Sequence, residues 1–194
     1  MQTPVSWRNP QLYPNCPLSL QWGMFASLSD AIAQSALRPI VIDWLMNVPG
    51  LPPILQSIHI LCVALLVATA GFLHLRMLGL ALPSQELGEM FERLRPWFLW
   101  ALGIAFLSGL PLIIARPDQY FFNPVAGWKL LGFSVMLLVT SALYLKHRSH
   151  PDYWTANPAQ RWTGGLLSLI ALSAMIVTIL AGRWIAYVDY LYWE

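Results

Sequence analysis

The chain has 194 residues, of which 57% are hydrophobic and only 10% are charged. A soluble domain carries about 25% charged residues, so this composition excludes a surface that faces water all round, and lipid must cover much of it. The formal net charge of +2, with no basic stripe, excludes nucleic acid as a partner. Ten Trp and seven Tyr residues are typical of the aromatic belts at the two faces of a membrane.

The chain begins with a Pro-rich extension, residues 1–25, and residues 26–194 are expected to form a single membrane domain. Within 26–48, polar residues recur in an apolar segment and Pro39 argues against one continuous span. We therefore expect one or two short amphipathic helices that lie in the membrane interface. A buried re-entrant segment is the alternative for the same stretch.

The first membrane span is predicted at about 54–75. It lies within residues 44–75, which contain no Asp, Glu, Lys or Arg, and a helix needs about 20 apolar residues to cross a bilayer. His59 and His74 lie inside this span. Because ionisable residues at membrane depth are costly, each histidine is a candidate functional residue.

Three further spans are predicted at about 97–115, 125–145 and 164–187. Pro96 is expected to open the second of them, because a proline at the start of a helix removes an N–H that has no partner there. The four spans predict an all-α fold, an integral membrane four-helix bundle with an N-terminal interfacial amphipathic helix.

The loops between spans define two sides of the bundle. Side B carries the charged loops 81–95 and 146–163, and side A carries the N-terminal segment, the 116–124 loop and the C-terminus. The 81–95 loop is expected to form a short solvated helix with a Glu89–Arg93 pair. Side B holds six of the eleven Lys and Arg residues, so the positive-inside rule puts side B in the cytoplasm and both termini outside it.

Four stretches carry a resemblance to a known family: IHILCVALLVATAGFLHLRMLGL, LRPWFLWALGIAFLSGLPLIIARPDQYFFNPVAGWKLLGF, LYLKHR and LAGRWIAY. Over about residues 27–187 the chain resembles an uncharacterised bacterial family of small four-span inner-membrane proteins, classed as a domain of unknown function. The matching positions are His59, Arg76, Gly79, Gly109, Lys129, His147, Gly182, Arg183 and Tyr187. The resemblance implies a multi-pass protein of the bacterial inner membrane. The family usually has an acidic residue where this chain has His74, and it brings no established activity.

A polar cluster is predicted about one turn inside side A, where His59, Lys129 and Arg183 lie at similar depth on three spans. No span supplies an acid there, so an anionic or strongly accepting group should face the cations: a quinone carbonyl, a haem propionate, a lipid phosphate or a carboxylate from a partner chain. Trp128 and Trp184 flank the cluster and could stack on a flat ligand such as a quinone, haem b or a chlorophyll-type pigment. The alternative is interfacial anchoring by the Trp residues, snorkelling by the cations, and a bond from His59 to a backbone carbonyl.

A second candidate site is a haem on side B between His74 and either His147 or His150. Two haems within the chain are excluded, because no other span has a histidine near side A. The alternative is that His74 hydrogen-bonds a neighbouring helix while His147 ends a span in water. No metal site is predicted.

No catalytic motif is visible, and no span holds paired carboxylates. The chain is therefore predicted to be a non-catalytic membrane subunit of a larger redox or energy-transducing complex. The alternative is a b-type haem or quinone-binding electron carrier. A small transporter is a third interpretation, and the lack of an acid at mid-membrane argues against it. Membrane lipids and other membrane subunits are the expected partners.

Overall fold

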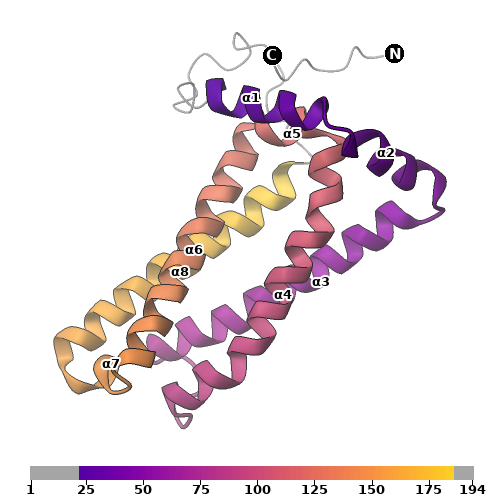
Figure 1. Cartoon of the computed structure of the whole chain (residues 1–194). Helices are drawn as coiled ribbons and strands as arrows, with labels where there is room; N and C mark the ends of the chain where they lie inside the picture. Colours follow the sequence, from indigo (N-terminus) through magenta and orange to yellow (C-terminus); the bar gives the residue numbers. More distant parts are fainter. Residues whose placement is uncertain (1–21, 186–194) are drawn as a thin grey trace.

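The structure of the chain is a computed structural model that describes residues 22–185 (Figure 1). These residues form eight helices and no strand. Four of the helices are long and apolar enough to cross a membrane: α3 (Leu51–Met77), α4 (Leu87–Ala115), α6 (Pro124–Ser149) and α8 (Pro158–Trp184). The predicted all-α membrane four-helix bundle is confirmed, and the four helices fit a multi-pass membrane protein.

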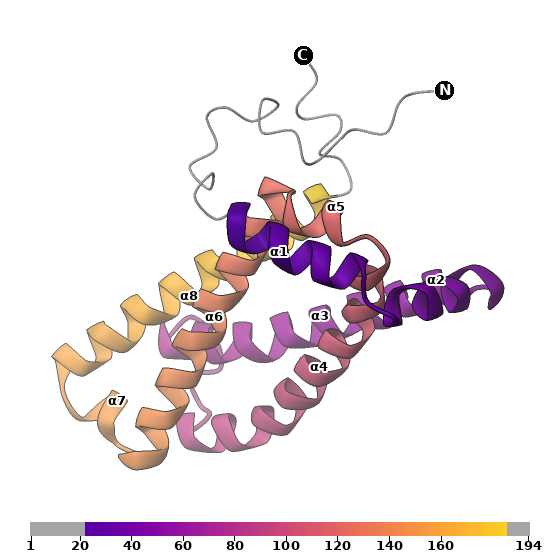
Figure 2. The same ribbon diagram turned by 45° about the horizontal axis from the view of Figure 1, so that its top comes forward.

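Two short helices, α1 (Trp22–Ala33) and α2 (Leu37–Asn47), run across the side-A end of the bundle (Figures 1 and 2). They confirm the expectation of one or two short helices. The break falls at 34–36, before Pro39. Pro39 is tolerated in the first turn of α2 because the N–H groups there have no partner within the helix.

The remaining two helices are single turns at opposite ends of the bundle: α5 (Pro117–Phe121) at side A and α7 (Tyr153–Ala156) at side B (Figure 1). Ser29 Oγ of α1 donates a hydrogen bond of 2.7 Å to Asp118 Oδ1 of α5. Ser29 is fully buried, so this bond fixes α1 over the end of the membrane helices.

The helix that contains the second span begins ten residues earlier than predicted. Pro96 lies inside α4, and the expected separate helix over 81–95 is largely the first turns of α4. A proline removes one helix hydrogen bond, which does not end a helix whose other turns are held by packing. In this segment of the described chain the ion pair joins Glu92 and Arg95, at 4.0 Å, instead of the predicted Glu89 and Arg93.

The four long helices form two antiparallel hairpins, α3–α4 and α6–α8, which meet mainly through α3 and α8 (Figure 1). A Cβ at Gly132 of α6 would lie 2.7 Å from the Ala174 carbonyl oxygen of α8, so glycine is what lets these two helices approach. By contrast, α4 and α6 lie apart along most of their length. One side of the bundle is therefore not closed by helix packing.

Candidate functional site

His59, in the side-A half of α3, is held against α4. Its Nδ1 lies 2.9 Å from the Ala105 carbonyl oxygen and 3.2 Å from Ser108 Oγ. A carbonyl only accepts, and Ser108 already donates to the Ile104 carbonyl at 2.7 Å, so Nδ1 carries the proton. In the neutral ring, Nε2 then presents a lone pair. Glycine at 109 makes room for the ring, since a Cβ there would lie 3.2 Å from His59 Cε1.

Lys129 extends from α6 toward α8. A Cβ at Gly182 of α8 would lie 3.7 Å from Lys129 Cε and 3.9 Å from Cδ, so the aliphatic stem runs over this glycine. The side chain is half-buried. Among residues 22–185, no side chain or carbonyl forms a hydrogen bond or ion pair with the Lys129 ammonium.

At side A, His59 thus joins α3 to α4, while Lys129 lies where α6 meets α8. No hydrogen bond or ion pair joins the two side chains among residues 22–185, and the polar cluster of His59, Lys129 and Arg183 stays a prediction. Arg183 follows Gly182 in α8 and has an exposed side chain, one step round the helix from the face that meets Lys129. Trp128 and Trp184 are 50% and 51% exposed, which suits anchors at the edge of the site better than walls inside it.

His74 lies in the opposite half of α3 and is 0% exposed. Its Nε2 is 3.0 Å from Thr140 Oγ1 of α6, and its Nδ1 is 3.3 Å from Ser168 Oγ of α8. Thr140 donates its own proton to the Met136 carbonyl at 2.7 Å, so it accepts from His74 Nε2–H, and Nδ1 accepts from Ser168. Both ring nitrogens are used, and the imidazole links three helices.

His147, the other predicted haem ligand, lies near the side-B end of α6. Its ring stacks on Phe91 of α4 with the centroids 4.9 Å apart, and its buried Nδ1 has no hydrogen-bond partner. Thr140 and His147 are separated by seven residues, about 10 Å along the helix. Because both nitrogens of His74 already bind hydroxyl groups near Thr140, the geometry does not present His74 and His147 as two ligands of one iron. The haem interpretation gains no support here and stays a prediction.

The hydroxyl partners of the two histidines were missed by sequence reasoning. Ser108, Thr140 and Ser168 each occupy a mid-helix position and bind an imidazole. The sequence did offer one signal for these partners: a Ser or Thr within a span, whose hydroxyl needs a hydrogen-bond partner in lipid. Which hydroxyl faces which histidine depends on how the helices rotate about their axes, which the sequence does not state.

Comparison of the chain with known protein families, curated proteins and solved structures found no match. The resemblance to a family of small four-span inner-membrane proteins therefore stays a prediction.

Proposed function

We propose that the chain is a non-catalytic integral membrane subunit of a larger redox or energy-transducing complex in a bacterial inner membrane, with side B in the cytoplasm. One observation carries the proposal: α4 presents an apolar stripe that no helix of the described chain covers. Of the most apolar stretch of α4, 17% is buried, against 22% in α6 and 33% in both α3 and α8.

The stripe carries a shallow hollow. An open depression of about 690 Å³ runs along α4 and is lined by Glu92, Arg95, Pro96, Leu99, Trp100 and Gly103. These positions recur at intervals of three and four residues, so they share one helix face. Trp100 is 71% exposed at its centre. A Trp beside a Gly on one face offers both contact area and close backbone approach, which suits a partner membrane helix.

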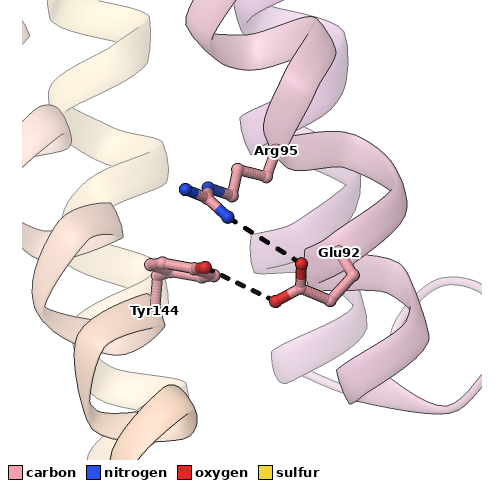
Figure 3. Close-up of polar contacts among 3 residues, drawn as sticks. All are labelled: Glu92, Arg95 and Tyr144. Carbon is pink, nitrogen blue, oxygen red and sulfur yellow. Dashed lines mark hydrogen bonds and ion pairs between the residues drawn. The ribbon is translucent and has the colours of Figure 1, made fainter.

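The side-B end of this stripe has defined polar geometry. Tyr144 of α6 donates a hydrogen bond of 3.4 Å to Glu92 Oε1, and the Arg95 guanidinium lies 5.3 Å from the centroid of the Tyr144 ring (Figure 3). These contacts join α4 to α6 at side B, beside the stacking of Phe91 on His147. A partner helix seated on the stripe would meet this polar group at one end and an apolar surface beyond it.

The class of complex is the narrower part of the proposal. It is supported by two histidines within the spans and by the polar cluster at side A, because ionisable groups at membrane depth mark functional sites and relays. Membrane lipids are expected to cover the rest of the apolar surface.

Site-specific photo-crosslinking in native membranes tests the proposal. A photoreactive residue in place of Trp100 should give one discrete adduct with another membrane protein. The matched control is the same residue in place of Ile176, which is exposed on α8 and should give lipid adducts only. Adducts of Trp100 with lipid alone, or with a second copy of the chain, would contradict a role as subunit of a larger complex.

A further inference from the structure

Arg95 lies at the side-B end of the open stripe of α4 with its hydrogen-bonding capacity unused. Its guanidinium carries five N–H donors. Among residues 22–185 the group makes no hydrogen bond, and in its ion pair with Glu92 the Nη1 and Oε2 atoms are 4.0 Å apart. The Arg95 side chain is 45% exposed, and it lines the hollow on α4. The stripe therefore ends in a cation that can still donate to an oxygen from outside the chain.

The guanidinium is held in position although its donors are free. Its carbon lies 5.3 Å from the centroid of the Tyr144 ring, and Figure 3 shows it extended from α4 toward this ring of α6. The Tyr144 hydroxyl donates to Glu92 Oε1, so both oxygens of Glu92 already face a partner. An incoming cation would meet Arg95 and find the carboxylate engaged, whereas an incoming carboxylate would find free N–H donors. The charges at this end of the stripe therefore select an acceptor.

The exposed residues of α4 have the spacing of a helix-packing seam. Glu92, Pro96, Leu99, Gly103 and Phe106 are all exposed, and they follow one another at intervals of four and three residues. This is the pattern along which two long helices pack when they cross at about 20°. The ends of the seam are about 21 Å apart along the helix axis. The stripe is therefore long enough for a partner helix to pack on it over about four turns.

Small residues form the floor of this seam. Pro96 and Gly103 lie between Arg95 on one flank and Trp100 on the other, because successive residues are about 100° apart round a helix. A Cβ at Gly103 would meet no heavy atom of the chain within 4 Å, so the backbone is open there. Close approach of backbones over small residues is how membrane helices pack, whereas a lipid chain adapts to bulky side chains. The groove therefore favours a helix over a phospholipid.

We propose that the stripe of α4 packs against a membrane helix of another subunit, and that an Asp or Glu at the side-B end of that helix pairs with Arg95. This partner chemistry rests on the function proposed above. Arginine suits the pairing because its planar fork donates two parallel N–H bonds to one carboxylate. The Tyr144 ring beside the guanidinium holds the fork in place for this contact.

The test uses the full chain in native membranes with a photoreactive residue in place of Trp100. The discrete adduct with another membrane protein is quantified relative to the amount of inserted chain. Arg95→Gln should lower the adduct by about tenfold or more, because the partner carboxylate loses its cation. The matched control is Arg93→Gln, since Arg93 is exposed on the same helix and does not line the hollow. Its adduct should be unchanged.

Charge reversal separates loss of the pairing from loss of the fold. Arg95→Glu should abolish the adduct, and replacement of the partner's acid by arginine should restore it. The crosslinked peptide identifies that acid, because it should come from a membrane span with an Asp or Glu at its side-B end. The combined reversal restores the adduct only if both chains fold and meet at this position.

The outcomes distinguish failure of the pairing from failure of the function proposed above. Equal adducts from the Arg95→Gln and Arg93→Gln variants would refute the pairing and leave the subunit role in place. A crosslinked span without an acid at its side-B end, or a charge reversal that restores nothing, would do the same. Adducts with lipid alone, or with a second copy of the chain, would refute both the pairing and the subunit role.

Discussion

His59 and His74 lie on the same helix, yet the structure gives them different surroundings. His74 is fully buried and binds Thr140 and Ser168 through its two nitrogens. His59 is partly exposed and binds α4 through Nδ1 alone. The hydrogen bonds also select opposite tautomers, with the proton on Nε2 in His74 and on Nδ1 in His59.

The difference separates a structural role from a binding role. A buried imidazole whose two nitrogens are both satisfied joins helices and has nothing left to offer a ligand. An imidazole with one satisfied nitrogen still has capacity for a ligand. Residue type and membrane depth alone do not make this distinction, whereas the number of satisfied hydrogen-bonding atoms does.

The largest expected effect tests the structural role of His74. His74→Leu keeps a side chain of similar bulk but removes both inter-helix hydrogen bonds and leaves Ser168 without its imidazole partner. Such bonds in membrane proteins contribute about 0.6 to 1.7 kcal/mol each, so the variant should lose about 2 kcal/mol of unfolding free energy. Reversible unfolding of the reconstituted chain in mixed micelles measures this loss.

Two controls sharpen this result. Ser168→Ala removes one of the two bonds and should cost less than His74→Leu. The double variant His74→Leu/Ser168→Ala should cost less than the sum of the two single variants, because the two residues share one hydrogen-bond network. A His74→Leu variant as stable as the unmodified chain would contradict the structural role and reopen the assignment of His74 to a ligand.

The second effect has the opposite sign and concerns side A. In the absence of ligand, Lys129→Met removes a charge that no described residue compensates, while a similar aliphatic stem still covers Gly182. The variant should therefore gain about 1 kcal/mol of unfolding free energy, because an uncompensated cation in a membrane span is costly. The same unfolding measurement, with Lys146→Met as control, detects the gain. A loss of stability would show that the ammonium already has a partner.

The fold was largely predictable from the sequence because lipid imposes simple rules. Four apolar stretches of sufficient length predicted four spans, and each one coincides with a long helix of the structure. The fourth helix, α8, ends at Trp184, and residues 186–187 of the fourth predicted span lie outside the described residues. The errors are at helix ends. The prediction began the second span just after Pro96, whereas α4 begins at Leu87 and continues through this proline. Local proline chemistry suggested a boundary, and packing against α3 kept the helix intact.

The candidate site was predictable only in part. The depth of His59 and Lys129 could be counted along each span, but their neighbours could not: the structure sets His59 against α4 and Lys129 against Gly182 of α8. The same count placed Arg183 with them, but a one-residue step round α8 turns Gly182 toward Lys129 and leaves Arg183 exposed. The depth of a residue in the membrane follows from its residue number. Which neighbour its side chain faces depends on the rotation of the helix and on which hairpins pack together, and hydropathy encodes neither the rotation nor the packing.

The third prediction returns to the histidine with one bound nitrogen. His59→Leu removes the bond to the Ala105 carbonyl, but that carbonyl is in a helix and still accepts from Ser108 Oγ at 3.2 Å. The loss of unfolding free energy should therefore be about 0.6 kcal/mol, well below that of His74→Leu. Measured under the same conditions, equal losses at the two positions would remove the distinction on which the comparison rests.

The smallest effect separates the buried network around His74 from the exposed contacts that bridge α4 and α6 nearby. Tyr144→Phe deletes the hydroxyl that donates to Glu92 at 3.4 Å, but it keeps a ring beneath Arg95 and beside Phe91. A long, exposed hydrogen bond contributes little, because water replaces it, and the ring contacts persist. Unfolding free energy should fall by only about 0.2 kcal/mol. A loss comparable to that of His74→Leu would mean that the contacts between α4 and α6, rather than the buried imidazole, hold the two hairpins together at side B. The open stripe of α4 would then be less accessible to a partner than its exposure suggests.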